Sequence, residues 1–228
     1  MAELFLRRWQ RRLRWLAGRG WSAEDFAQRY AAPVADAWGY RDSPQHQRRA
    51  DWILAALPRD RFERALEVGC AQGFLSERLA GRVDHLIACD ISAEAIRRAR
   101  ENCRELPQVE FHVADIRSGF PGGDFDLCLF SDVLYYLSAR ETDAVLEEAG
   151  RQIALGGFLF IVNEWSKRAR GLTPPAYAFA KLDAGAHWKR IAFQEIPYGD
   201  GDLSLAIYQL SVSMPRPQTP SAPATHAG

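Results

Sequence analysis

The chain has 228 residues, enough for one large domain with a sizeable core. Hydrophobic residues make up 47% and charged residues 25%, and 29 basic side chains balance 29 acidic ones to a formal net charge of zero. This balance gives no support to general nucleic-acid binding, and no apolar run in the sequence approaches the length of a membrane span.

The N-terminal segment and the cysteines indicate the compartment. Residues 1–20 lack the uninterrupted apolar core of a signal peptide. The cysteines show no C-x-x-C pairing, so we expect buried reduced thiols rather than a zinc site or a disulfide framework. The four are Cys70, Cys89, Cys103 and Cys128. We therefore expect a cytoplasmic protein that holds no metal.

Residues 1–20 carry six arginines and one glutamate, and their apolar side chains recur at helical spacing. Two interpretations stay open. The segment is either a basic amphipathic arm for weak contact with a membrane surface or an acidic partner, or a terminal helix that packs on its own domain or a second subunit.

Residues 21–64 are expected to form an N-terminal helical cap. Ser22 is placed to cap a first helix that Pro33 should end. The aromatic segment WGYRDSP at 38–44 reads as a turn, and a second helix is expected from about Gln45 to Leu57, before Pro58.

From residue 65 onward, short apolar runs alternate with helical segments. Strands are expected at 65–68, 85–90, 109–113, 125–130 and 157–162, with helices at about 73–80, 92–104 and 139–153. This alternation predicts an α/β fold with a parallel sheet covered on both faces. Segments 188–196 and 203–212 flank the turn YGDGD and predict an antiparallel hairpin at one edge, which makes seven strands. The expected domain spans 65–212, and the proline-rich tail 213–228 is expected to be disordered.

The stretch ALEVGCAQGFLSERLA, residues 65–80, reads as a strand, a glycine-containing turn and a helix. Such a turn presents backbone N–H groups to a nucleotide-like ligand. A dinucleotide fingerprint would place Ala71 and Phe74 at its second and third glycines, and phenylalanine at the close-packing position disfavours a dehydrogenase. The spacing present is Glu67-x-Gly69-x-Ala71-x-Gly73.

This spacing resembles the first motif of class I S-adenosylmethionine (SAM)-dependent methyltransferases, [DE]-x-G-x-G-x-G. The resemblance implies a Rossmann-like fold, SAM as cofactor and S-adenosylhomocysteine (SAH) as product. Glu67 would meet the SAM ammonium, Asp90 the ribose hydroxyls and Asp115 the adenine amino group. The implied cofactor contacts are Trp38, Tyr40, Glu67, Gly69, Cys70, Ala71, Gly73, Asp90, Ile91, Ala114, Asp115, Ile116 and Ser131.

Three further features resemble the NodS-like, nodulation-type N-methyltransferases. They are the aromatic segment of Trp38, Tyr40 and Ser43, the cysteine in the glycine turn, and the VLYYL segment at 133–137. Founding members of that family methylate the free amine of a deacetylated glucosamine in a chitooligosaccharide. The resemblance runs from about Trp38 to about Asn163 and implies a small-molecule acceptor.

The acceptor site is expected beside the fourth and fifth strands. Aromatic faces suit a sulfonium or a sugar ring, so we assign Tyr30 and Tyr135 to acceptor binding together with Asp132. The catalytic candidates are His187, Glu164 and Tyr136, the first two as general bases. His46 and Asp132 are further candidates for the base.

Three functions stay open on the sequence. The first is N-methylation of a small amine such as an amino sugar. The second is O-methylation of a hydroxyl or carboxylate of a secondary metabolite, and the third is a non-catalytic SAM-fold subunit that docks through residues 1–20. Nothing in the sequence reads [DN]-P-P-[YFW], which disfavours the nucleic-acid N-methylating subgroup that carries this motif.

Overall fold

A computed structural model describes residues 22–30, 36, 38–166 and 173–215. The basic segment 1–20 and most of the predicted tail, residues 216–228, lie outside the described residues. The described strands are β1 (Phe62–Val68), β2 (Val83–Asp90), β3 (Val109–Val113), β4 (Phe125–Ser131), β5 (Ile153–Ser166), β6 (Trp188–Tyr198) and β7 (Gly201–Leu210).

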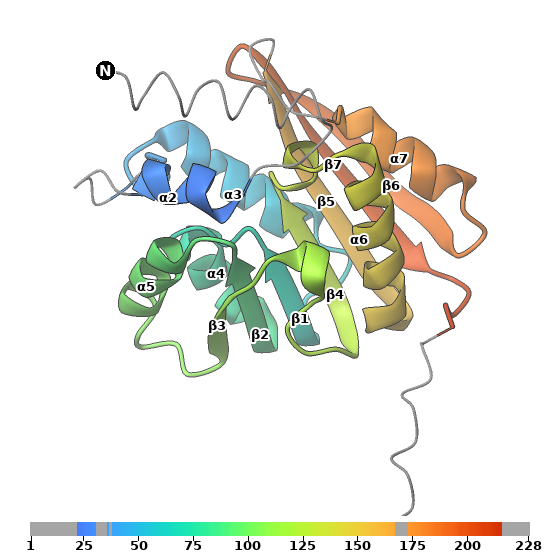
Figure 1. Ribbon diagram of the computed structural model, residues 1–228, viewed down its shortest axis with the longest axis horizontal. Coiled ribbons are helices and arrows are strands. Elements are labelled where there is room, and N and C mark those ends of the chain that lie inside the picture. Colours follow the sequence, from blue (N-terminus) through green and yellow to red (C-terminus); the bar gives the residue numbers. More distant parts are fainter. Residues whose placement is uncertain (1–21, 31–35, 37, 167–172, 216–228) are drawn as a thin grey trace, which may run out of the picture.

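These strands form one seven-stranded sheet in the order β3-β2-β1-β4-β5-β7-β6 (Figure 1). Strands β1 to β5 are parallel, and β7 lies antiparallel between β5 and β6. The central strands are near-continuous apolar runs because helices cover both of their faces. The sheet confirms the predicted fold, a mostly parallel Rossmann-like sheet with an antiparallel hairpin at its edge.

Six helices surround the sheet in the described part of the chain: α2 (Ala23–Tyr30), α3 (Pro44–Ala56), α4 (Phe74–Leu79), α5 (Ala93–Asn102), α6 (Ala139–Gln152) and α7 (Pro175–Ala184). Three single 3-10 turns join them: η1 (Ala80–Arg82), η2 (Ile116–Ser118) and η3 (Leu134–Tyr136). The sequence did not predict α7. Serine caps begin α5 and α6, where the Ser92 and Ser138 side chains accept the backbone N–H of Ala95 and Glu141.

The helices divide into two layers. One apolar core lies between the sheet and α3, α4 and α5, and it includes Ile53, Leu79 and Ile96. The other lies under α6 and α7, and it includes Val145 and Phe179 (Figure 1). The cap helix α2 lies outside the first layer, against α5.

The ordered chain extends past the predicted boundary of the tail. Met214 is half-buried and packs against the core under α6. A Cβ placed on Gly150 of α6 would overlap the Met214 sulfur and lie 3.4 Å from Trp188. Met214, which lies within the predicted tail, therefore packs against the domain.

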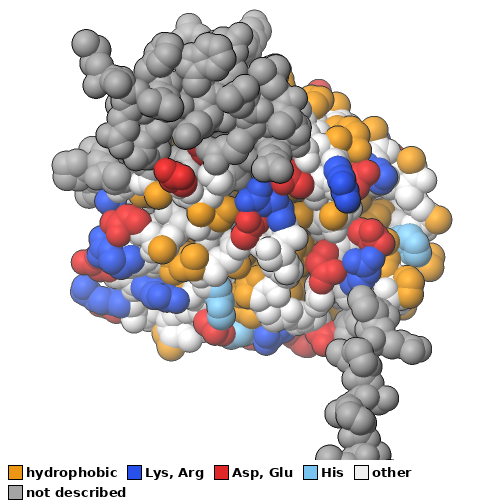
Figure 2. Space-filling model, in the orientation of Figure 1, with side chains coloured by type: hydrophobic (Ala, Val, Ile, Leu, Met, Phe, Trp, Pro, Cys, Tyr) orange, Lys and Arg blue, Asp and Glu red, His pale blue; other side chains and the backbone are white. Residues whose placement is uncertain are grey.

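The surface carries charges of both signs. Figure 2 shows arginine, lysine and carboxylate side chains interleaved over one face. Many of them pair within one helix, as Arg97 does with Glu94 at 2.8 Å and Arg151 with Glu148 at 3.2 Å. Among the described residues, no helix combines the length and the hydropathy needed to cross a bilayer.

Candidate functional site

The order of the sheet locates the site. The parallel strands β1 and β4 are neighbours at the centre of the sheet. The chain continues from β1 through β2 to β3 at one edge, and from β4 to β5 on the other side. Open α/β sheets bind ligands outside the carboxyl ends of the strands at such a reversal. The glycine turn 69–73 follows β1, and the segment 131–136 follows β4.

Both glycines of the turn have left-handed backbones, Gly69 at φ +80° and Gly73 at φ +81°. A Cβ on Gly69 would overlap the Val133 side chain and lie 3.0 Å from the Ser131 carbonyl oxygen. A Cβ on Gly73 would lie 3.0 Å from the Cys103 sulfur. The glycines therefore admit neighbouring parts of the protein, the segment after β4 and the end of α5.

Protein acceptors occupy most of the backbone N–H groups of the turn. Gly69 and Cys70 both donate to the Cys89 carbonyl, at 2.8 and 3.0 Å, and Gly73 donates to the Cys70 carbonyl at 2.9 Å. Ala71, at φ +49°, donates to an Asp90 carboxylate oxygen at 3.1 Å. This corrects the expectation that the turn presents these groups to a ligand. Recognition falls mainly to side chains around the turn.

Two carboxyl groups lie at the ends of β1 and β2. Glu67 is 1% exposed and accepts a hydrogen bond from the Ser76 hydroxyl at 2.5 Å. Burial raises the pKa of Glu67 to about 7, although the Ser76 hydrogen bond acts to lower it. Asp90 accepts the backbone N–H of Ser92 at 2.9 Å, and desolvation raises the pKa of Asp90 to about 6. Both acids are poised to ionise near neutrality when a cationic or hydroxyl partner arrives.

An aromatic cluster covers the turn. The Trp38 indole donates to the Tyr30 hydroxyl at 2.8 Å, and the rings of Trp38 and Tyr40 stack at 6.4 Å. Tyr30 is 2% exposed and packs with Ala71 and Ala95. Tyr30 therefore lies on the side of the glycine turn, not on the acceptor side where we placed it. Beneath Tyr40 remains a cavity of only about 20 Å³.

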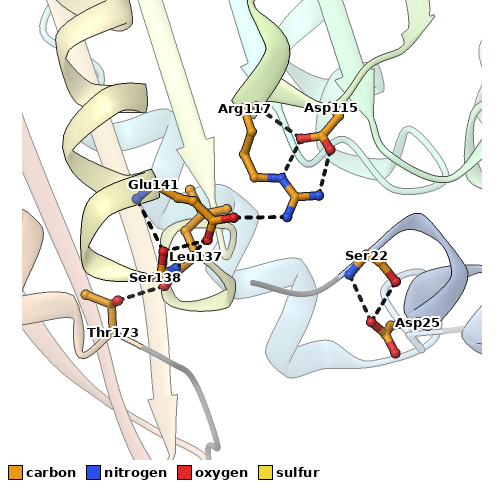
Figure 3. A network of polar contacts seen from close by, with 8 residues as sticks. All are labelled: Ser22, Asp25, Asp115, Arg117, Leu137, Ser138, Glu141 and Thr173. Carbon is orange, nitrogen blue, oxygen red and sulfur yellow. Dashed lines mark hydrogen bonds and ion pairs between the residues drawn. The ribbon is translucent and has the colours of Figure 1, made fainter. Parts of the chain in front are cut away.

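The region assigned to adenine is held by its own ion pairs. Arg117 donates to both carboxylate oxygens of Asp115, at 2.8 and 2.6 Å, and pairs with Glu141 at 3.2 Å (Figure 3). This pairing lowers the pKa of Asp115 against the opposing effect of desolvation. Figure 3 shows the Arg117 guanidinium between the two acids, so Asp115 reaches adenine only if it shares its carboxylate. That role stays a prediction.

The three apolar or small residues expected near adenine differ in their surroundings. Ala114 donates its backbone N–H to the Asp90 carbonyl at 3.0 Å. Ile116 is buried in the core under α6, whereas Ile91 is half-buried after β2. Ile116 therefore contributes to packing, and Ile91 and Ala114 stay candidates for the cofactor surface.

Arg49 of α3 is the main residue that the sequence reasoning missed. Its guanidinium forms an ion pair with Asp132 and donates to the Ser131 hydroxyl at 3.1 Å. Asp132 has a left-handed backbone at φ +56°, and its other carboxylate oxygen accepts the Glu164 N–H at 2.7 Å. The pair therefore fixes the cap helix α3 to the ends of β4 and β5.

Tyrosines and a carboxyl group gather beside this pair. The rings of Tyr135 and Tyr136 lie 4.5 Å apart, and Trp165 lies 6.3 Å from Tyr135. Tyr136 also meets Phe26 of α2 edge-on at 5.0 Å. Burial and the nearby Asp132 charge raise the pKa of Glu164. The structure thus brings Tyr135, Tyr136, Glu164 and Asp132 together.

His46, one of the further candidates for the base, pairs with Tyr198, a residue that the sequence reasoning missed. The His46 Nδ1 and the Tyr198 hydroxyl lie 2.7 Å apart, and the Tyr40 ring meets the imidazole edge-on at 4.9 Å. Burial and the Arg49 charge lower the pKa of His46, which keeps the imidazole neutral near pH 7. This pair brings the end of β6 to the site.

His187, a predicted general base, lies far from the acceptor site. Its Nδ1 lies 3.1 Å from the Val212 carbonyl oxygen, just before β6 begins. Because β6 runs in the same direction as β5, its first residues lie at the amino-terminal edge of the sheet. The register pairs Trp188 with Leu210 and Glu164 with Leu203, which puts His187 about eight residues of strand, or roughly 26 Å, from Glu164. His187 therefore cannot touch an acceptor at the carboxyl ends.

Comparisons with known proteins agree with this geometry. Residues 65–157 match the family model of a methyltransferase domain. Nodulation protein S of Rhizobium tropici is 32% identical over 126 residues, which cover 54% of this chain and 53% of that protein. The trans-aconitate 2-methyltransferase of Azoarcus sp. is 34% identical over 149 residues, which cover 62% of this chain and 56% of that protein. The chain thus spans about half the length of these curated relatives.

The fold also has solved counterparts. The crystal structure of the N-methyltransferase NodS from Bradyrhizobium japonicum WM9 with SAH superposes with a TM-score of 0.75 at 22% identity. The match covers 83% of this chain and 98% of that one, and it establishes the fold. The glycine turn, the acid after β2 and the strand order agree with these matches, and the chain belongs to the class I SAM-dependent methyltransferases, near their NodS-like members.

Proposed function

We propose that the protein transfers a methyl group from SAM to the amine of a small molecule such as an amino sugar. The observation that carries this proposal is the charge around the ends of β4 and β5. The carboxyl groups of Asp132 and Glu164 act on each other there, and Arg49 pairs with Asp132. With two carboxyl groups to one guanidinium in this described cluster, the site favours a cationic acceptor, and an amine arrives as an ammonium.

The residues at the glycine turn suit the cofactor of this family. Glu67 offers a carboxylate to the ammonium of SAM, and Asp90 offers one to the ribose hydroxyls. The cavity between α3 and the turn is lined by Glu67, Gly69, Cys70, Ala71 and Ser131, so the chain presents polar and small groups where the donor would lie. When bound, SAM supplies an electrophilic methyl group on its sulfonium.

The acceptor side has two tasks. An ammonium must lose a proton before its nitrogen can attack, and the raised pKa of Glu164 makes its carboxylate a better proton acceptor than an ordinary glutamate. The faces of Tyr135 and Tyr136 offer flat apolar surfaces to a sugar ring, and they exclude water. General-base help of this kind is typically worth about 10²–10⁴-fold in rate.

Transfer of labelled methyl from SAM tests the proposal. A chitooligosaccharide with a free amine at its non-reducing end is compared with its fully acetylated counterpart. We expect label on the free amine alone, and a rate at least about tenfold lower in Glu164→Gln. Glu195→Gln is the matched control, because this glutamate is exposed on β6. Label on neither oligomer, with SAH still bound, would reject the amino sugar and keep the methyltransferase.

A further inference from the structure

The strand β6 forms one edge of the sheet and is open to solvent. Its inner side pairs with β7, and no strand among the described residues pairs with its outer side (Figure 1). Every residue from Lys189 to Glu195 is exposed, including the large apolar side chains of Ile191 and Phe193, which are 41% and 42% exposed. A long, exposed and apolar edge strand is a template for pairing with another strand.

A bulge decides which side chains of β6 share a face. Its register skips Ile191, because Arg190 lies opposite Tyr208 and Ala192 lies opposite Ile207. Alternate residues of β7 lie on one face of the sheet, and the residues opposite them share that face. The side chains of β6 on the face that α7 covers are therefore Arg190, Phe193 and Glu195, which lie opposite Tyr208, Ala206 and Ser204.

These three side chains form a row, which we name the β6 row. It holds a guanidinium, an aromatic ring and a carboxylate at even spacing, because the bulge places each of the three two ladder positions from the next. A half-turn about the central Phe193 lays Arg190 opposite Glu195 of a second copy. The β6 row is thus complementary in charge to itself, and a two-fold interface requires such a surface.

We propose that two copies of the chain associate edge to edge through β6, antiparallel about a two-fold axis at Phe193. Arg190 of each copy faces Glu195 of the other, and the two Phe193 rings meet at the centre. Both bulges lie opposite Gln194 of the other copy, so the pairing continues on either side of the axis. Opposite charges and aromatic rings placed directly across antiparallel strands stabilise such a pair.

The helix α7 leaves room for this approach. It packs on the β6 row through Phe179, which meets the central ring edge-on at 5.6 Å, and through Asp183, which pairs with the arginine of the row at 3.1 Å. A guanidinium has five N–H donors, so this arginine can keep Asp183 while it meets a carboxylate of the second copy. The opposite flank of α7 contacts α6, and helical spacing places the small, exposed side chains of Ala176 and Ala180 on the flank away from it.

Sedimentation of the full chain over a concentration series tests the interface. We expect the mass to rise from the 25.7 kDa of one chain toward twice that value. Glu195→Arg and Arg190→Glu each put like charges at both contacts, and each should weaken the dimer at least about tenfold. Lys189→Glu is the matched control, because it changes the net charge as Arg190→Glu does but lies on the other face of β6, so its dimer should persist.

Mixing the two variants separates the interface from folding. Glu195→Arg and Arg190→Glu chains place opposite charges at both contacts of a mixed dimer. We therefore expect the mixture to dimerise at a concentration at which each variant alone is monomeric. This result does not depend on SAM binding or on methyl transfer.

Three results would overturn the proposal. A mass of one chain at every concentration would show that the bulge and the charges protect this edge from pairing. A dimer that both variants keep would place the contact on another surface. Two monomeric variants whose mixture stays monomeric would refute the register that sets Arg190 opposite Glu195.

Discussion

Replacing Gly69 with alanine should destabilise the protein by more than its backbone angle explains. The residue sits at φ +80°, where an L side chain costs about 1–2 kcal/mol, partly offset by about 0.4–1 kcal/mol from a stiffer unfolded chain. The new methyl group would also overlap Val133 and press on the Ser131 carbonyl oxygen at 3.0 Å. Overpacking of this kind typically costs about 1–3 kcal/mol.

The matched control is Gly156→Ala. This glycine has φ +81°, nearly the angle of Gly69, but nothing lies within 4 Å of a Cβ placed there. Urea unfolding of the two variants should therefore differ by about 1–3 kcal/mol, with Gly69→Ala the less stable. Equal losses of unfolding free energy in the two variants would refute the steric argument, and they would leave the left-handed angle as the whole requirement at Gly69.

Three other outcomes follow from the same contacts. Because only ionised Glu67 pairs with an ammonium, SAH affinity by calorimetry should fall about tenfold from pH 8 to pH 6, through its pKa of about 7. Ser76→Ala removes the hydrogen bond that favours the ionised form, so it should move this midpoint to higher pH, and a pH-independent affinity would contradict the assignment. Tyr30→Phe removes the acceptor of the Trp38 indole and should speed SAH association about 2–10-fold in stopped-flow measurements. An unchanged association rate would show that the hydrogen bond between Trp38 and Tyr30 does not limit ligand entry. Ser138→Ala breaks the capping box of α6 and should cost about 1 kcal/mol of unfolding free energy in urea, and no loss would show that the box adds nothing.

The elements that the sequence predicted well are those whose signal is local. Alternating apolar runs and helical segments gave the strands and most helices, because periodicity and caps act within a few residues. The β6–β7 hairpin was predicted as a pair, but its direction relative to β5 was not, because that depends on the crossover through α7. This is why His187 was placed at the wrong edge of the sheet.

The missed site residues carry a weaker signal that could have been found. Arg49 lies four residues before Ile53 and eight before Leu57, so it shares the face of α3 that packs on the sheet. A charged residue on an apolar face needs a partner, and Asp132 supplies it from a segment 83 residues away. The face was readable from the sequence, but the partner depended on tertiary contact. His46 and Tyr198, 152 residues apart, meet for the same reason.

The cap and the ligand site are built from the same contacts, so their energetics are linked. A cavity of about 20 Å³ is far below the several hundred Å³ of a small-molecule site, so side chains that line it, such as Tyr40 of the aromatic segment, have to shift to admit a cofactor. The cap is held by the bond from Trp38 to Tyr30 and by the ion pair from Arg49 to Asp132. Tyr30 covers the turn, and Arg49 lines the cavity. Binding energy must therefore offset the loss of some cap contacts, and a weaker cap should raise the observed affinity by the same free energy.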